Sequence, residues 1–358
     1  MKPALVRYCL IVLAYFSTLV SAKAGTPAPA PQLKDPRTVG ALNLIWENDA
    51  FLLTGASDKH YTNGIRLEFT MGKPANLDSA KWPLNKFEPL FKQSNQIYLT
   101  GHIGHNMYTP RDTSTSLLQI NDRPYAAWLY GGLRYAEVND WETGIFKLDV
   151  RDYTSLELNL GVIGPWAQGD GLQNWIHDQI GSGDTLGWDH QISNEVVFDL
   201  NYFQSHSLRV LGEKDAVFSI DVEPFLNLRA GSVHVHGGLG LGGAIGLNHT
   251  QGATSRRLGY SGPLGTQDPD PKDLSIAVFG SIEGRGVAWN TFLEGPIFGD
   301  SVHTVDTEPF IWHAEVGVMA RIKSFNISYM QVMRSDEFDG QEGIHQYGQF
   351  RVGCEWRW

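Results

Sequence analysis

The C-terminal strand constrains the fold most, because apolar and polar residues alternate along residues 347–358. One face of this strand carries Phe350, Val352, Cys354, Trp356 and Trp358, and the other carries Gln349, Arg351, Glu355 and Arg357. Such a strand can turn its apolar face to hydrocarbon and its polar face to a lumen. After residue 25 the chain has no apolar run long enough for a membrane helix. An exported chain with these properties can span a bilayer only as a closed barrel.

Residues 1–24 have the pattern of a secretory signal peptide. Lys2 and Arg7 precede an apolar stretch over residues 8–20, and Ala22-Lys23-Ala24 fits a cleavage site. We therefore expect a signal peptide over 1–24, a flexible Pro- and Ala-rich leader over 25–38 and a transmembrane barrel over 39–358.

The acidic charge balance argues against nucleic acid as a partner. The chain has 28 Lys and Arg against 39 Asp and Glu, a net charge of −11. Nucleic-acid binding favours basic surfaces, whereas acidic surfaces suit divalent cations. Cys9 lies in the signal and Cys354 remains alone, so the sequence excludes a disulfide framework.

Alternation of period two recurs along the chain and predicts an all-β fold. The clearest segments are 42–47, 65–71, 155–162 and 310–322, and weaker ones lie near 96–107, 126–136, 195–206, 217–228, 233–247, 274–284 and 325–333. With 347–358 these segments predict a twelve-stranded antiparallel outer-membrane β-barrel. The even count puts both termini in the periplasm. The connections near 49–61, 108–125 and 164–193 all follow odd strands, so we expect them at the extracellular rim.

The first rim connection gathers oxygen ligands. Asn48 and Asp49 end the first strand, and Thr62 begins the second. A hairpin brings these ends together, and converging oxygens are what Ca²⁺ requires. Ordinary turn chemistry explains the same residues equally simply, because Asn, Asp and Gly favour turns.

The second rim connection leads into Asp122, Arg123 and Pro124. Asp122 and Arg123 can pair within the barrel mouth, or Arg123 can hold a phosphate. We interpret the following Trp128 and Tyr130 as part of an aromatic girdle at the membrane interface.

The third rim connection predicts a short helix over 170–181, with Asp170 as its cap and Gly181 at its end. Gln173 and His177 lie four residues apart and share a helix face. A histidine can serve as a general base at neutral pH. The alternative for His177 is an ordinary packed or solvated loop histidine.

A competing interpretation rests on His60-Tyr61-Thr62-Asn63, which has the form of barrel esterases with a hydroxyl nucleophile. His60 and Thr62 are two apart on one strand and would share a face. Thr62 is a hindered hydroxyl, however, and no acid is placed to orient His60, so this metal-free pair is the second hypothesis. A non-enzymatic, porin-like barrel is the third.

The ordered motifs resemble the lipid A 3′-O-deacylase family of Gram-negative outer membranes. The matching pieces are Glu-Asn-Asp at 47–49, Tyr-Thr-Asn-Gly at 61–64, Asn-Asp-Arg-Pro-Tyr-Ala at 121–126, Gly-Val-Ile-Gly-Pro at 161–165, Gln-Asn-x-x-His-x-x-Ile-Gly at 173–181 and Phe-Asp-Gly-Gln at 338–341.

This resemblance implies a calcium-dependent hydrolase that removes the 3′-linked acyloxyacyl chain of lipid A in the outer leaflet. It assigns the general base to His177, catalytic roles to Asn48 and Gln173, and metal binding to Asp49 and Thr62. We expect a monomer in the outer membrane whose partner is lipid A or lipopolysaccharide. The second rim loop offers one arginine, Arg111, where the family has a basic pair, so the resemblance does not locate the phosphate-binding residues.

Overall fold

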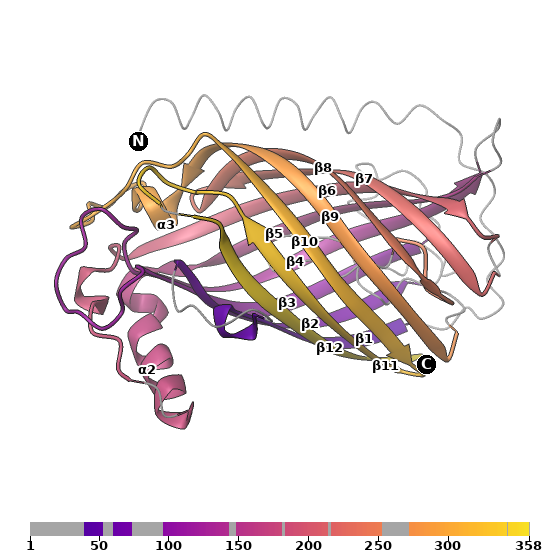
Figure 1. Cartoon of the computed structure of the whole chain (residues 1–358), viewed down its shortest axis with the longest axis horizontal. Helices are drawn as coiled ribbons and strands as arrows, with labels where there is room; N and C mark the ends of the chain where they lie inside the picture. Colours follow the sequence, from indigo (N-terminus) through magenta and orange to yellow (C-terminus); the bar gives the residue numbers. More distant parts are fainter. Residues whose placement is uncertain are drawn as a thin grey trace.

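The chain forms a closed antiparallel barrel (Figure 1). This computed structural model describes residues 39–52, 60–73, 96–142, 148–180, 183–213, 216–252, 272–341 and 343–357. The expected signal peptide, the leader and Trp358 lie outside these residues.

Twelve strands make up the described barrel, as the sequence predicts. They are β1 (Val39–Asn48), β2 (His60–Lys73), β3 (Gln96–Thr109), β4 (Ala126–Glu142), β5 (Asp149–Ile163), β6 (Glu195–Leu211), β7 (Phe218–Gly231), β8 (His234–Leu247), β9 (Leu274–Asn290), β10 (Phe310–Ile322), β11 (Phe325–Arg334) and β12 (His345–Arg357). Each strand pairs with its neighbour in the sequence, and β1 closes the barrel against β12, with Leu42 opposite Cys354.

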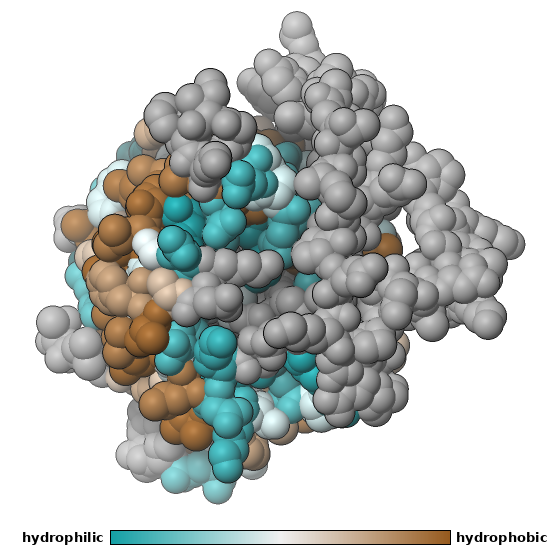
Figure 2. Space-filling model, turned by 90° about the vertical axis from the view of Figure 1, so that its right-hand side faces the viewer, coloured by the Kyte–Doolittle hydropathy of each residue, from teal (hydrophilic) through white to brown (hydrophobic). Residues whose placement is uncertain are grey.

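The period-two pattern determines which side chains face the bilayer. Leu44 and Trp46 of β1 are exposed on the outer wall, while Asn43 before them and Glu47 after them are buried inside. β12 shows the predicted division, with Phe350, Val352 and Trp356 exposed outward and Gln349, Arg351 and Glu355 buried inward. Figure 2 looks onto the end opposite the helices and shows apolar residues on the outer wall and hydrophilic residues toward the middle.

Ion pairs fill the middle of the lumen. Arg66 of β2 donates to Glu157 of β5 at 2.7 Å, and Arg134 of β4 donates to the same carboxylate at 2.9 Å. Arg134 also pairs with Glu68 of β2. Arg134 and Glu157 face each other on neighbouring strands, whereas the contacts of Glu157 with Arg66 and of Arg134 with Glu68 reach across the strands between them, so the network lines the inside of β2 to β5.

The helical elements lie at one rim, in connections that follow odd strands (Figure 1). They are η1 (Asp49–Phe51), η4 (Gly164–Ala167), α2 (Gly169–Ile180), η5 (Trp188–His190) and α3 (Thr291–Glu294). The C-terminal end of β12 lies at the opposite rim. In the described part of the chain, no helix is long and apolar enough to cross a membrane.

The predicted rim helix is present as α2, but its start differs from the expectation. The helix begins at Gly169, so Asp170 lies inside the first turn, where its side chain accepts a hydrogen bond from Asn174 at 2.7 Å. Gly181 is outside the described residues.

The interpretation of Trp128 and Tyr130 as an interfacial girdle is wrong. Both side chains point into the barrel, each is 3% exposed, and their rings stack with centroids 4.0 Å apart. Leu129 between them is the residue that faces the bilayer. The Trp128 ring packs near Phe292 of α3, which stacks on Tyr108 and helps to fill the mouth of the lumen.

Candidate active site

The helix α2 packs against the outside of the barrel wall over β3, β4 and the end of β5. Met107 of β3 and Ala127 of β4 have the outward orientation of Ile103 and Leu129, which are exposed. They form an apolar cluster with Tyr125, Ala167 and Trp188, and Leu172, Ile176 and Val162 pack against it. The inner face of α2 therefore covers the bilayer side of the wall.

A tight turn after β5 directs the chain back onto this wall. Gly164 has φ +75°, and a Cβ there would lie 2.7 Å from the carbonyl oxygen of Ile192, so glycine is required. Pro165 then fixes the first turn of η4. The outward His105 of β3 binds the carbonyl oxygen of Ala167 at 2.8 Å and attaches η4 to the wall.

His177 and Gln173 lie on the buried face of α2. His177 is 8% exposed, and its Nδ1 lies 2.7 Å from the carbonyl oxygen of Gly183. A carbonyl only accepts, so in the neutral ring Nδ1 carries the proton and Nε2 is the basic nitrogen. Gln173 is 1% exposed, and its Oε1 accepts a hydrogen bond from Trp188 Nε1 at 2.8 Å.

The rim ends of β1 and β2 contribute Asn48 and Thr62 to the same outer wall. Thr62 is the extra residue of a β-bulge between Tyr61 and Asn63, and its hydroxyl shares a 2.7 Å hydrogen bond with Thr109 of β3. The Oδ1 of Asn48 accepts a hydrogen bond from the Ala50 backbone N–H at 2.7 Å, and its Nδ2 donates to Asn63 Oδ1 at 3.4 Å. These contacts orient the Asn48 amide group as a donor.

Asp49 begins η1, which lies over the outer wall on the β12 side of β1. Phe51 of η1 packs between Trp46 of β1 and Phe350 of β12, with ring centroids 4.9 and 5.1 Å away. The Phe51 carbonyl also accepts a hydrogen bond from Tyr329 at 2.7 Å. Asp49 itself is 2% exposed.

The five predicted site residues thus share one rim, in two groups separated by β3. Asn48, Asp49 and Thr62 come from the ends of β1 and β2 and from η1, and Gln173 and His177 come from α2. On β3, Thr109 bonds to Thr62, and Met107 packs in the cluster beneath α2. The arrangement supplies a basic nitrogen and amide donors on the bilayer side of the wall, and a buried carboxylate at the same rim.

The two residues predicted to bind the metal offer hard oxygens, which fits calcium rather than zinc. Asp49 brings a carboxylate and Thr62 a hydroxyl. Within the described residues, no group of three or more His, Cys, Asp or Glu side chains could hold a metal. A cation here would take its other ligands from carbonyl oxygens, amides or water, and residues 53–59 of the same connection are outside the description.

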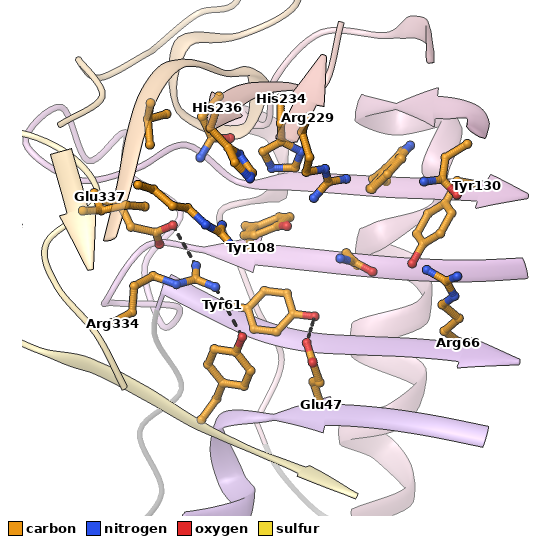
Figure 3. A pocket seen from close by; sticks show the side chains of 18 of the residues that line it. Glu47, Tyr61, Arg66, Tyr108, Tyr130, Arg229, His234, His236, Arg334 and Glu337 are labelled. Atoms are coloured by element: carbon orange, nitrogen blue, oxygen red, sulfur yellow. Dashed lines mark hydrogen bonds and ion pairs between the residues drawn. The ribbon is translucent and has the colours of Figure 1, made fainter. Parts of the chain in front are cut away.

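The lumen also contains a pocket, whose charges are paired within the protein (Figure 3). Arg66 pairs with Glu157, Arg229 with Asp199, Arg285 with Glu283 and Arg334 with Glu337. The Tyr61 hydroxyl donates to Glu47 at 2.7 Å. The barrel wall separates this pocket from the acyl chains of the membrane, so the outer wall is the better candidate site for a lipid substrate.

The second rim connection has a structural role different from the expected pairing of Asp122 with Arg123. Asp122 accepts backbone N–H groups of Arg111 and Arg123, whereas the guanidinium of Arg123 lies 3.6 Å from Glu337 and over the Tyr108 ring. Burial raises the pKa of Glu337, but Arg334 and Arg123 outweigh burial and lower it to about 2. Arg123 is fully buried inside the mouth, away from the outer wall.

The His60–Thr62 hypothesis requires a free hydroxyl nucleophile at Thr62. The β-bulge between Tyr61 and Asn63 places Thr62 beside Thr109 of β3. The Thr62 hydroxyl is moreover engaged with Thr109. The His60 side chain is outside the described part of the chain.

Sequence reasoning did not identify four groups that hold the candidate residues. These are Trp188, Asn63, Thr109 and the carbonyl of Gly183. Asn63 could have been identified from the sequence, because it belongs to the Tyr-Thr-Asn-Gly motif. The other three act through tertiary contacts that no local spacing indicates.

A family model described as outer membrane protein LpxR matches residues 10–356. The chain belongs to the LpxR family. This confirms the family resemblance carried by the motifs, and it places the protein in the outer membrane.

Among solved structures, LpxR from Salmonella typhimurium aligns with a TM-score of 0.70 at 20% identity, covering 88% of this chain and 99% of that one. The translocator domain of the autotransporter NalP from Neisseria meningitidis aligns with a TM-score of 0.42 at 9% identity, covering 99% and 97%. The β-domain of the Bordetella autotransporter BrkA aligns with 0.43 at 10% identity, covering 90% and 100%. The comparison with curated proteins gives no match.

Proposed function

We propose that this LpxR-family barrel hydrolyses the 3′-linked acyloxyacyl ester of lipid A in the outer leaflet. The observation that carries the proposal is the position of α2. This helix holds His177 and Gln173 against the bilayer side of the wall, where an ester of a membrane lipid can approach without leaving its leaflet.

His177 acts as the general base. Its Nε2 takes a proton from a water molecule, and the water oxygen forms a bond to the ester carbonyl carbon. The resulting tetrahedral oxyanion collapses, the bond to the sugar oxygen breaks, and that oxygen takes the proton back from His177. The products are a free acyloxyacyl acid and a lipid A with a 3′-hydroxyl group.

Asn48 donates from its side-chain amide to the oxyanion, since its own Oδ1 is held by the Ala50 N–H. Asp49 and Thr62 are the residues we assign to calcium binding. When bound, Ca²⁺ would withdraw electron density from the ester carbonyl and offset the oxyanion charge. We further propose that the protein acts as a monomer, with lipopolysaccharide as its membrane partner.

The test uses the full-length protein refolded in detergent with a hexa-acylated lipid A. We expect mass spectrometry to show loss of one acyloxyacyl group from the 3′ position, with calcium present and not after chelation. Matched assays with a glycerophospholipid identify the substrate class. Hydrolysis of the glycerophospholipid alone, or of neither lipid, contradicts the proposal.

A further inference from the structure

Trp188 connects the apolar base of α2 to one polar side chain of the candidate site. Its ring is 3% exposed, packs on Tyr125 with centroids 5.0 Å apart and belongs to the cluster between α2 and the wall. A Cβ on Gly169 would lie 2.5 Å from this ring, so the start of α2 also fits closely against it. Trp188 is therefore held rigidly.

The indole N–H of Trp188 fixes which way the Gln173 amide points. An indole nitrogen only donates, so the atom 2.8 Å away must be the amide oxygen and not the NH₂ group. The NH₂ group is then directed away from Trp188. It is buried and has no hydrogen-bond partner within the described protein.

A buried donor without a hydrogen-bond partner lowers the stability of the folded protein, and a substrate atom that accepts a hydrogen bond from it removes this penalty. Gln173 lies one helical turn from His177 on the same face of α2, so its NH₂ group and the basic Nε2 of His177 serve the same region. Resting on the proposed function, we infer that Trp188 is a positioning residue that presents the Gln173 NH₂ as a second donor to the oxyanion.

Two substitutions separate the positioning role from simple packing. Trp188→Phe keeps an aromatic ring and removes the N–H. Trp289→Phe is the matched control, because Trp289 is also buried and donates its indole N–H to the Ser232 carbonyl at 3.1 Å, outside the α2 cluster. We expect Trp188→Phe to lower kcat about three- to thirtyfold with KM unchanged, and Trp289→Phe to leave both within about twofold.

The role of the NH₂ group is tested through Gln173. Gln173→Glu keeps an acceptor for the indole but removes the donor, so kcat should fall about a hundredfold, as in Gln173→Ala. In the Gln173→Ala background, Trp188→Phe should cost nothing further, because the residue acts through Gln173. An independent, additive loss in the double variant would overturn the inference, as would equal losses in the two Trp variants.

The hydrogen bond can also be measured without turnover. In a ¹H–¹⁵N spectrum of the indole N–H groups, Gln173→Ala should shift the resonance that is missing in Trp188→Phe. If this shift occurs but the wild-type protein hydrolyses no lipid A, the hydrogen bond stands, and both the proposed function and the catalytic role fall. If lipid A is hydrolysed and the indole resonance does not move, the inference alone is wrong.

Discussion

The Nδ1 atom of His177 lies 2.7 Å from the carbonyl oxygen of Gly183. The contact fixes both the tautomer and the orientation of the imidazole. Nδ1 carries the proton, and Nε2 is the basic nitrogen that remains to take a proton from water. It also ties α2 to the segment that follows it, which contains Trp188.

Replacing His177 by alanine removes the proposed base. We expect kcat for lipid A deacylation to fall about a hundredfold to ten-thousandfold, while the barrel still folds because the side chain belongs to a rim helix. His190→Ala is the matched control, since His190 is a rim histidine of η5 whose Nε2 lies 3.0 Å from the Ser116 carbonyl oxygen. Heat-modifiable gel mobility verifies folding, and full activity of His177→Ala would end this mechanism.

Substitutions of Thr62 distinguish the two hydrolytic chemistries. If Thr62 supports the calcium site, Thr62→Ala removes a hydroxyl that is hydrogen-bonded to Thr109, and activity should fall less than about tenfold. Thr62→Ser keeps the hydroxyl and should keep the activity. If Thr62 is the nucleophile, Thr62→Ala and His60→Ala abolish turnover and His177→Ala is nearly silent. Initial rates of the three alanine variants rank the hypotheses, and the second ranking would refute ours.

The barrel could be predicted from sequence because alternation of period two is a local signal. Leu44 is apolar and lies on the bilayer side of the wall, whereas Glu47 is charged and lies on the lumen side. Counting the alternating segments gives the number of strands. Whether a strand is odd or even in this count then gives the rim at which its following connection lies. The same logic explains why the five candidate residues could be assigned to one rim.

Three features required the structure. Trp128 and Leu129 are both apolar, so local hydropathy does not tell which faces the bilayer; packing against Phe292 turns Trp128 inward. Thr62 lies on a bulge, which breaks the parity that a sequence argument assumes. The fold of α2 onto the outer wall depends on contacts with Met107 and Ala127, which are distant in sequence.

Asp49 is the carboxylate we assign to calcium. Asp49→Asn should raise the calcium concentration needed for half-maximal activity by about tenfold or more, because an amide oxygen carries no charge. The control is Asp184→Asn, which neutralises an exposed rim acid near α2. Calcium titrations after chelation provide the measurement, and identical calcium dependence of all three proteins would remove Asp49 from the site.

Glu337 makes stability depend on pH. Burial raises its pKa, but Arg334 and Arg123 outweigh burial and lower the pKa from 4.5 to about 2 in the folded protein. The carboxylate therefore stabilises the fold fully above about pH 4.5, by roughly 3 kcal/mol, and this contribution is lost as the pH falls toward 2.

We expect Glu337→Gln to lower the unfolding temperature at pH 7, because two buried guanidinium groups lose their shared partner. Between pH 4.5 and 2 the wild-type protein should lose stability faster than the variant. Asp306→Asn, at an exposed acid of the same rim, should follow the wild type. Parallel pH profiles for wild type and Glu337→Gln would show that the ion pair does not stabilise the barrel.

The network of Arg66, Arg134 and Glu157 predicts that the lumen does not conduct ions. These buried side chains project into the lumen from β2, β4 and β5, and Phe292 and Tyr108 pack in its mouth. The folded protein should therefore give no stepwise conductance in a planar lipid bilayer at neutral pH. Arg66→Ala combined with Arg134→Ala removes the cationic half of the barrier and should raise conductance, provided that gel mobility shows a folded barrel. Steady ohmic steps from the wild-type protein, abolished by heat denaturation, would favour the porin-like alternative over a sealed hydrolase.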